Sequence, residues 1–401
     1  MRKTSAIVWD HEMRYPQQLP YDPSRNYPEW ENCGMPVGPE NKVYDALRQC
    51  MIDLGMDYDN IGTKQWSPLS EIIQPGDTVV IKPNLVFNAA DPAVQAYTTT
   101  HPAVIRVIID YVWKALDGRG KIIVGDAPSA EADLDVIQNR NRLPELLEIL
   151  RQREVPVTFE DFRAVKVRVE NGIWVGEQGG NEKGRPLIVN LGKASMLYEP
   201  EKRHRKLHGA GYNIRETTAH HRGEQQEYCV SETILRADVV ISVPKLKTHR
   251  KAGITCCLKN LVGINTDKNY LPHFTMGSAS RGGDEMPTIP LKNQIFMGAY
   301  NFFRENVIAY TWKLIGGPGS HFLQWAARHS RKQTTTAGFC EKGTRQANST
   351  DLAAWLHEKL SGQKVAAGAW SGNRTICRMV LDLNKIFLYC DKDGKLAEEP
   401  V

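Results

Sequence analysis

Short runs of consecutive apolar residues alternate with longer amphipathic segments along the first 161 residues of the chain. The runs show no polar alternation, which is typical of strands buried on both faces, and they lie at 75–84, 120–129 and 155–161. The amphipathic segments place apolar residues three or four positions apart and predict helices at 42–55, 101–118 and 133–153. A fourth buried run at 236–245 and a predicted helix at 253–264 repeat the pattern farther along.

Strands that alternate with helices in this way predict an α/β fold, three-layered and Rossmann-like, with a mostly parallel sheet. Residues 162–230 interrupt the pattern with polar and basic residues and two short predicted strands, so we expect an inserted, lid-like segment. We divide the chain into an irregular N-terminal arm (1–40), an α/β core (41–275) and a C-terminal extension (276–401). The extension is expected to be mainly helical, with helices near 293–315, 351–360 and the start of 378–396, and to pack on the core.

The composition is that of an ordinary globular protein, with 41% hydrophobic and 24% charged residues. The net charge of +5 is too small to indicate a nucleic-acid partner. The densest basic run, 202–208, has no interleaved aromatic residues and is better explained as a solvated loop. No segment approaches about 18 uninterrupted apolar residues, and the basic start lacks the apolar centre of a signal peptide. We therefore expect a cytoplasmic protein without a membrane segment, for which nucleic acid is a disfavoured partner.

The spacing of the cysteines and the absence of known binding motifs argue against several classes of cofactor site. The eight cysteines form no CxxC pair, which argues against a zinc ribbon or a self-contained iron–sulfur cluster. Cys256 and Cys257 are adjacent on a predicted helix, where neighbouring side chains diverge by about 100°, so they cannot easily chelate one metal together. A structural role is favoured over a redox role for both. The chain also lacks a P-loop, a GxGxxG fingerprint, HExxH and GxSxG. The cofactor is therefore unassigned: there is no nucleotide-binding motif, no metal ligands are predicted, and a divalent metal remains open.

The candidate functional residues are alike in their placement: each follows a predicted buried strand or flanks the helix that comes after it. Ligands of parallel α/β sheets bind at the carboxyl ends of the strands, so these residues are expected at one edge of the sheet. They are Lys82 and Asn84 after the first strand, Thr99, Thr100 and His101 before the helix at 101–118, Asp126 and Ser129 after the second strand, Lys245, Lys247, Thr248 and His249 after the fourth, and Lys259 and Asn260 on the helix that follows.

The lysines in this set offer positive charge for a phosphate or carboxylate. Lys82, Lys245 and Lys247 would bind the anion together with helix N-terminal amides near Thr100 and Ser129. A lysine crowded by other cations at a partly buried strand end loses proton affinity and can act as a base near neutral pH. We expect the following Arg250 and Lys251 to be loop surface.

The remaining polar residues suit proton transfer and orientation. His101 and His249 are candidate proton shuttles. Asp126 could orient a lysine or histidine or hold a divalent cation. Asn84 and Asn260 can orient a carbonyl or hydroxyl group without adding charge. We therefore assign catalytic roles to Lys245, Lys247, His249, His101 and Asp126, and substrate-binding roles to the others.

Several of these segments occur in the same order in a known family. VVIKPNLV, TTTHPAVIRVII, KIIVGDAPS and ADVVISVPKLKTHRKAGITCCLKNLVGI resemble the domain of unknown function 362 (DUF362) family over roughly 75–275, and the tail DLNKIFLYCDKDGKL is similar to longer members. The resemblance implies no activity, because most members have none assigned. Some relatives are fused to ferredoxin-type iron–sulfur modules, which leaves an external redox partner open, and some carry twin-arginine export signals. This chain shows neither cysteine clusters nor such a signal.

Three functions fit these observations. The leading hypothesis is a cytoplasmic enzyme of small-molecule biosynthesis that acts on an anionic substrate by lysine–histidine acid–base chemistry; isomerase, lyase and group-transfer reactions all fit. The second is a redox or metal-dependent enzyme associated with iron, nickel or an iron–sulfur protein. The third is a non-enzymatic polyanion-binding protein that uses residues 202–208. A homodimer is compatible with each.

Overall fold

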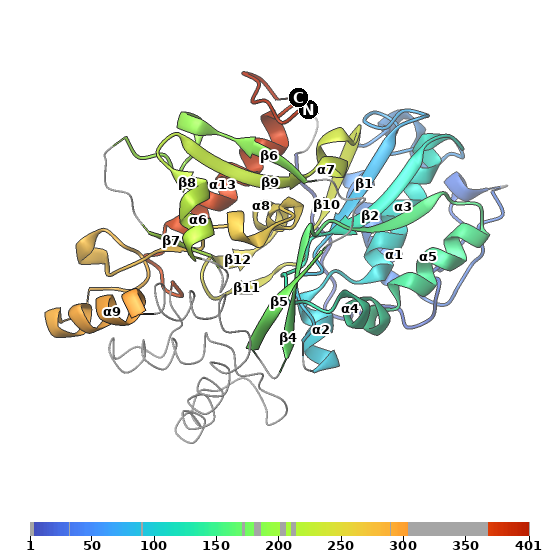
Figure 1. Cartoon of the computed structure of the whole chain (residues 1–401). Coiled ribbons are helices and arrows are strands. Elements are labelled where there is room, and N and C mark those ends of the chain that lie inside the picture. Colours follow the sequence, from blue (N-terminus) through green and yellow to red (C-terminus); the bar gives the residue numbers. More distant parts are fainter. Residues whose placement is uncertain are drawn as a thin grey trace. The chain divides into compact units, whose positions relative to one another are not determined.

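The computed structural model describes residues 4–31, 33–89, 91–170, 173–179, 186–200, 206–209, 214–288, 290–303 and 368–400 (Figure 1). Its internal contacts divide the chain into two compact units. Unit 1 comprises Met1–Pro128, Ala132–Asp161 and Arg236–Lys245, and unit 2 comprises Ser129–Glu131, Phe162–Leu235 and Leu246–Val401. The expected insertion at 162–230 and the expected C-terminal extension thus fall within the same unit.

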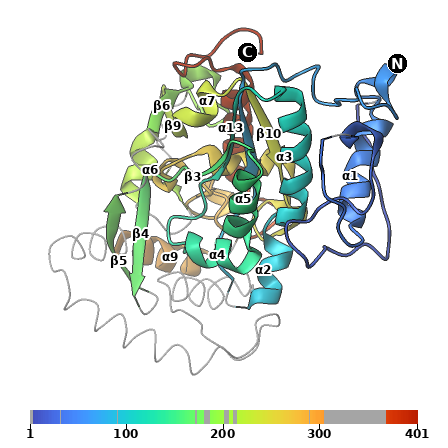
Figure 2. The ribbon, with the colours of Figure 1, turned by 90° about the vertical axis from the view of Figure 1, so that its right-hand side faces the viewer.

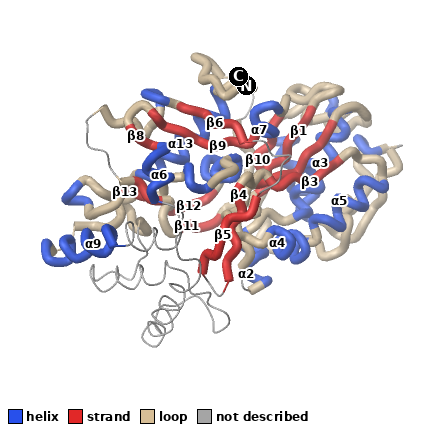
Figure 3. Tube along the Cα trace, viewed as in Figure 1, coloured by secondary structure: helices blue, strands red, loops and turns tan. Residues whose placement is uncertain are grey.

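Unit 1 is built on a four-stranded parallel sheet with the strand order β10–β1–β2–β3, of which Figure 3 labels β10, β1 and β3. The strands are β1 (Thr78–Pro83), β2 (Lys121–Asp126), β3 (Val157–Asp161) and β10 (Val239–Val243). Ile81 of β1 lies in register between Ile241 of β10 and Val124 of β2. Each strand falls within a predicted range, and the predicted α/β fold with a central parallel sheet is confirmed.

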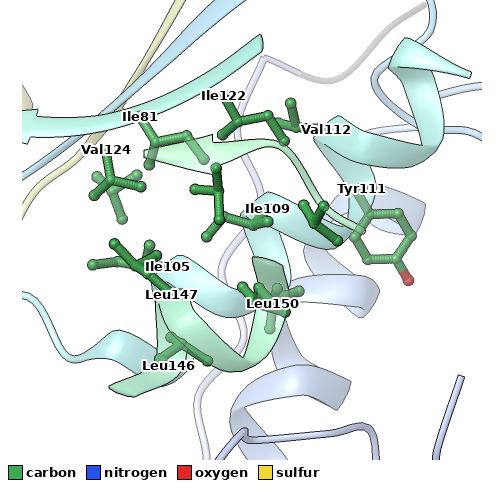
Figure 4. Close-up of a cluster of buried hydrophobic side chains, with 14 of the residues drawn as sticks. Ile81, Ile105, Ile109, Tyr111, Val112, Ile122, Val124, Leu146, Leu147 and Leu150 are labelled. Atoms are coloured by element: carbon green, nitrogen blue, oxygen red, sulfur yellow. The ribbon is translucent and has the colours of Figure 1, made fainter. Parts of the chain in front are cut away.

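Apolar side chains on one face of this sheet pack against the helices α3 (Pro102–Leu116) and α5 (Leu143–Gln152). Alternate strand residues point to the same face, which brings Ile81, Ile122 and Val124 together. The cluster drawn in Figure 4 consists of buried side chains that include Ile81, Ile105, Ile109, Ile122, Val124, Leu146, Leu147 and Leu150. Burying one such side chain is worth about 1.5–3 kcal/mol. Val80 points to the opposite face and is also fully buried, as the uninterrupted apolar run requires.

The helices of unit 1 follow the predicted order with two differences. They are α1 (Lys42–Asp53), α2 (Pro92–Thr98), α3 (Pro102–Leu116), α4 (Leu134–Asn141) and α5 (Leu143–Gln152), and α3 lies between α1 and α5 in Figure 2. The sequence did not predict α2. The single helix predicted at 133–153 is wrong, because Arg142 adopts a left-handed φ of 60° and Pro144 cannot donate a backbone hydrogen bond.

The N-terminal arm is irregular as expected in its described part, apart from the 3-10 turn η1 (Pro28–Trp30). Glu29 of this turn is fully buried. Its carboxylate accepts hydrogen bonds from Arg48 Nε at 2.6 Å and from the Tyr111 hydroxyl at 2.8 Å. The arm is therefore fixed to α1 by an ion pair and to α3 by a hydrogen bond.

Unit 2 contains short antiparallel strands and helices. The strands are β4 (Val165–Glu170), β5 (Ile173–Gly179), β6 (Pro186–Asn190), β7 (Leu207–His208), β8 (His221–Arg222), β9 (Gln225–Ser231), β11 (Lys247–His249), β12 (Gly253–Thr255) and β13 (Phe274–Thr275). The largest sheet has the order β6–β9–β8 (Figure 3), and the other strands form the pairs β4–β5, β11–β12 and β13–β7. The helices are α6 (Ile214–His220), α7 (Glu232–Arg236, whose last residue belongs to unit 1), α8 (Cys257–Asn260), α9 (Leu291–Phe303) and α13 (Thr375–Tyr389), with 3-10 turns that include η4 (Leu261–Ile264).

The helix predicted at 253–264 is wrong. Gly253–Thr255 instead pairs with Lys247–His249 as a hairpin, in which His249 faces Gly253. Gly253 has a φ of +73°, which suits glycine and does not belong in a helix. Only the four residues of α8 and the 3-10 turn η4 remain helical, so Cys256 and Cys257 do not share a helix.

The described part of the C-terminal region agrees only partly with the sequence predictions. α9 covers the beginning of the helix expected at 293–315, whereas its end and the helix at 351–360 lie outside the described residues. α13 begins earlier than the helix predicted at the start of 378–396, and the chain then turns at Gly394, whose φ is +77°. Within the described ranges, no helix is both long enough and apolar enough to cross a membrane.

Candidate functional site

In unit 1, a buried ion pair joins the carboxyl ends of β1 and β2. Lys82 Nζ lies 2.6 Å from Asp126 Oδ1 and also donates to the carbonyl of Pro83 at 2.8 Å. Asp126 Oδ2 accepts the backbone N–H of Leu85 at 2.6 Å. Lys82 is 1% exposed and Asp126 is 2% exposed. Burial lowers the pKa of Lys82, and the Asp126 carboxylate acts against that shift. This lysine is therefore engaged with the protein at the strand end.

The neighbouring loop residues are held by backbone hydrogen bonds. Asn84 and Thr100 exchange two bonds, from Asn84 N–H to Thr100 Oγ1 and from Thr100 N–H to the Asn84 carbonyl, both at 2.9 Å. The Thr100 hydroxyl then donates to the carbonyl of Val243 at 2.7 Å, which ties this loop to the end of β10. Thr99 is buried and donates to the carbonyl of Gln95. These three predicted residues have clear structural roles here.

A second polar group in unit 1 surrounds the start of α3. His101 caps this helix, because its Nδ1 accepts the backbone N–H of Ala103 at 3.1 Å. The ring of Tyr15 stacks on the His101 ring at a centroid distance of 4.1 Å. Lys245 Nζ donates to the Tyr15 hydroxyl at 2.8 Å. Burial, with the positive charge of Lys245, lowers the pKa of His101 to about 4. His101 is therefore neutral at physiological pH, with its proton on Nε2.

The other predicted residues belong to unit 2, where the β11–β12 hairpin presents Lys247 and His249. The two side chains share one face because strand residues alternate, whereas Thr248 is on the other face and is exposed. His249 Nδ1 accepts the backbone N–H groups of Lys251 and Ala252, both at 3.1 Å. These two hydrogen bonds hold the loop between β11 and β12 against the imidazole ring.

Two lysines with lowered pKa values lie in the same cluster. Burial lowers the pKa of Lys251 to about 8, and Glu285 acts against that shift. Burial, with the charge of Lys251, lowers the pKa of Lys259 to about 8. Lys251 Nζ lies 4.8 Å from the centre of the Phe274 ring. Within the described residues, neither ammonium group has a carboxylate within ion-pair distance. Lys247, His249, Lys251, Lys259 and His273 are called the lysine–histidine cluster below.

The two histidines of the lysine–histidine cluster carry their protons on opposite nitrogens. Burial and the neighbouring lysines lower the pKa of His249 to about 3, so this imidazole is neutral. Since its Nδ1 accepts two bonds, its proton lies on Nε2, which can donate to a ligand. Burial, with Lys251 and Lys259, lowers the pKa of His273 well below its ordinary value. Its Nδ1 donates to the carbonyl of Leu271 at 2.8 Å, so its Nε2 carries the lone pair.

Two predicted positions differ from the expected local structure. Ser129 was expected to open a helix, but α4 begins at Leu134 and is capped by Asp133, whose carboxylate accepts the Val136 N–H at 3.1 Å. Ser129 instead accepts a bond from Arg163 through its backbone carbonyl. Lys259 and Asn260 were expected on a helix spanning 253–264, but they are the last two residues of the four-residue helix α8. The Asn260 side chain is buried.

Sequence reasoning missed three residues that surround the predicted ones. Lys251 was expected to be loop surface and is partly buried, whereas Arg250 is exposed as expected. His273 precedes the two-residue strand β13, and nothing in its own sequence context indicates a polar site. Tyr15 comes from the irregular arm, where no periodic pattern exists to place it. Only the crowding of basic residues between 245 and 251 was a usable signal.

Comparisons with known proteins give a family but no activity. Residues 79–178 and 162–391 match the sequence profile of a family described as domain of unknown function (DUF362). No curated protein and no solved structure gives a significant match. The two matched ranges span more than half of the chain and contain most of the predicted strand-end residues. The chain therefore belongs to the DUF362 family, as its sequence resemblance predicted.

Proposed function

We propose that this protein is an enzyme that acts on an anionic small molecule, whose phosphate or carboxylate group binds at the lysine–histidine cluster. The observation that carries the proposal is the pair Lys251 and Lys259, two partly buried ammonium groups without a carboxylate ion pair among the described residues. Burying a charge is unfavourable unless it is paired. A ligand of opposite charge supplies the missing partner.

The electrostatics of the lysine–histidine cluster favour an anion over a neutral ligand. Lys247 and Arg250 contribute further positive potential, which is visible in the depressed pKa of His249. A bound anion would raise the pKa values of Lys251 and Lys259 toward the ordinary value. Hydrogen bonds from a lysine to phosphate or carboxylate are charge-assisted and roughly twice as strong as neutral ones.

The same groups suit acid–base chemistry. A lysine with a pKa of about 8 has roughly a tenth of its amine neutral at pH 7, so Lys259 can accept a proton. His273 offers a lone pair on Nε2, and His249 offers a donor on Nε2. An isomerase, a lyase or a group-transfer enzyme would use such a base beside a fixed donor. The reaction class stays open among these three.

Several further expectations from the sequence belong to this proposal and are not tested by the structure. A lid role for 162–230, the packing of 276–401 on the core, a cytoplasmic location, a role in small-molecule biosynthesis, a homodimer and an external redox partner all stay predictions. In unit 1, His101 and Lys245 belong to a separate polar group joined through Tyr15, and their substrate-related roles stay predictions. Lys82, Asp126 and Asn84 more directly support the strand ends.

Anion binding by defined variants tests the proposal. Thermal unfolding of the whole chain is followed with phosphate, pyrophosphate and a series of dicarboxylates, and we expect at least one to raise the melting temperature. K251M and K259M should each weaken that ligand at least tenfold in calorimetric titration. K292M, which removes an exposed lysine of α9, is the matched control and should bind normally. Normal binding by both K251M and K259M would refute the assignment.

A further inference from the structure

Cys256 and Cys257 form a pair of thiols where β12 leads into α8, whose first residue is Cys257. Their Sγ atoms lie 3.8 Å apart. Cys257 is exposed and Cys256 is partly exposed, so both can be reached from solvent. Cys256 has an extended backbone with φ −150° and ψ −150°, so the two cysteines are not arranged as neighbours within a helix, and the 3.8 Å between their Sγ atoms shows that the side chains approach each other. The sequence expectation that these side chains cannot share a ligand is therefore wrong in its premise.

The backbone on both sides of the thiol pair is anchored. β12 ends at Thr255, which pairs with Lys247 of β11. The Asn260 N–H donates to the Cys256 carbonyl at 2.9 Å, which closes the short helix α8. The Asn384 amide on α13 donates to the Leu258 carbonyl, also at 2.9 Å. A site on supported backbone keeps its geometry better than one on a free loop.

The separation of the sulfur atoms fits a shared metal ion better than a disulfide. Two thiolates that bind one tetrahedral metal ion at about 2.3 Å lie about 3.8 Å from each other. A disulfide bond needs about 2.05 Å between its sulfur atoms. The observed 3.8 Å is therefore the distance that a metal ion would require without rearrangement. Thiolates also select soft ions such as Cu(I) and Zn(II).

We propose that Cys256 and Cys257 form a two-thiolate site for one soft, thiophilic metal ion. Binding of a divalent ion forms two metal–sulfur bonds and releases both thiol protons to solvent, with no change of oxidation state. Among the residues that the structure describes, there is no cluster of three or more histidine, cysteine or acidic side chains that could hold a metal. Water or a small exogenous ligand can complete the coordination of such an ion.

Burial and the neighbouring Cys256 thiol raise the pKa of Cys257. The Cys257 thiol therefore holds its proton more tightly, and binding of a metal ion displaces thiol protons to solvent. Proton release is therefore a useful measure of metal binding at this site. Affinity should accordingly rise with pH. This inference stands apart from the proposed anion site, because it uses neither the charge of the lysines nor the histidine lone pairs.

Cadmium binding to the reduced chain tests the site, because Cd(II) thiolates absorb in the ultraviolet by charge transfer. We expect one Cd(II) per chain with this absorption, accompanied by proton release. C256S and C257S should each lose the absorption, whereas C33S and C377S, which remove exposed single thiols, should keep it. Circular dichroism checks that all four variants fold. Absent absorption in the wild type, or unchanged absorption in C256S and C257S, would overturn the proposal.

Discussion

Replacing Lys259 by methionine should stabilise the protein at neutral pH. Burial and Lys251 lower the pKa of Lys259 from 10.5 to about 8. Each pKa unit corresponds to 1.36 kcal/mol, so the charged form of Lys259 destabilises the fold by about 3 kcal/mol. Methionine keeps most of the length of the side chain and removes the charge. We expect K259M to raise the free energy of unfolding by about 2–3 kcal/mol at pH 7, since some of the cost is screened at a partly exposed amine.

The sign of this effect must change with pH in a defined way. Between about pH 8 and pH 10.5 the unfolded chain holds the Lys259 proton and the folded chain does not, so wild-type stability rises with pH in that window. Below about pH 8 both states are charged and the full cost is present. Above about pH 10.5 both are neutral and the cost disappears. The advantage of K259M should therefore be largest below pH 8 and vanish near pH 10.5.

Urea unfolding of wild type and K259M at pH 7, 8, 9 and 10 measures this difference directly. K292M serves as the control, because an exposed lysine should change stability by no more than about 0.5 kcal/mol at any pH. The reasoning is refuted if K259M is less stable than wild type at pH 7. It is also refuted if the two proteins differ equally at pH 7 and pH 10.

Two further predictions concern buried carboxylates. D126N should lower the free energy of unfolding by about 3–5 kcal/mol, because it removes the carboxylate that balances the buried Lys82 charge. The double variant K82M/D126L should lose less stability, and urea midpoints that rank the two variants the other way would contradict this. D284A should cost at least about 2 kcal/mol, because Asp284 Oδ2 accepts the N–H groups of Arg374 and Thr375 at the start of α13. Loss of α13 protection in hydrogen exchange is the accompanying signal, and full protection would argue against the capping role.

The central sheet could be predicted because its evidence is local. Strands buried on both faces need uninterrupted apolar runs, and Val79–Ile81 and Ile122–Val124 provide them. Helices that depend on one backbone conformation are harder to predict. The break at Arg142 rests on a left-handed φ that arginine rarely adopts. The β11–β12 hairpin rests on pairing between short segments, each of which has enough apolar residues to be mistaken for part of a helix.

The sequence could predict the approximate location of the candidate site but not the contacts within it. Position after a buried strand correctly indicated that Lys82 and Asp126 meet, since neighbouring parallel strands end together. It could not indicate that they neutralise each other, because burial depends on the whole surroundings. The lysine–histidine cluster depends on contacts made by the short strands β11–β13, which carry no periodic signal. His273 joins the cluster through tertiary packing alone.

Because of the strand order of unit 1, its parallel sheet can be completed only late in the synthesis of the chain. β10 pairs with β1, and the contact from the Thr78 N–H to Asp238 spans 160 residues of chain. Until β10 leaves the ribosome, β1 has one open hydrogen-bonding edge lined by apolar residues. Such edges recruit strands from other chains, and contacts of long sequence separation form slowly. A nascent or truncated chain that stops before Val243 is therefore the form most exposed to aggregation and most in need of chaperones.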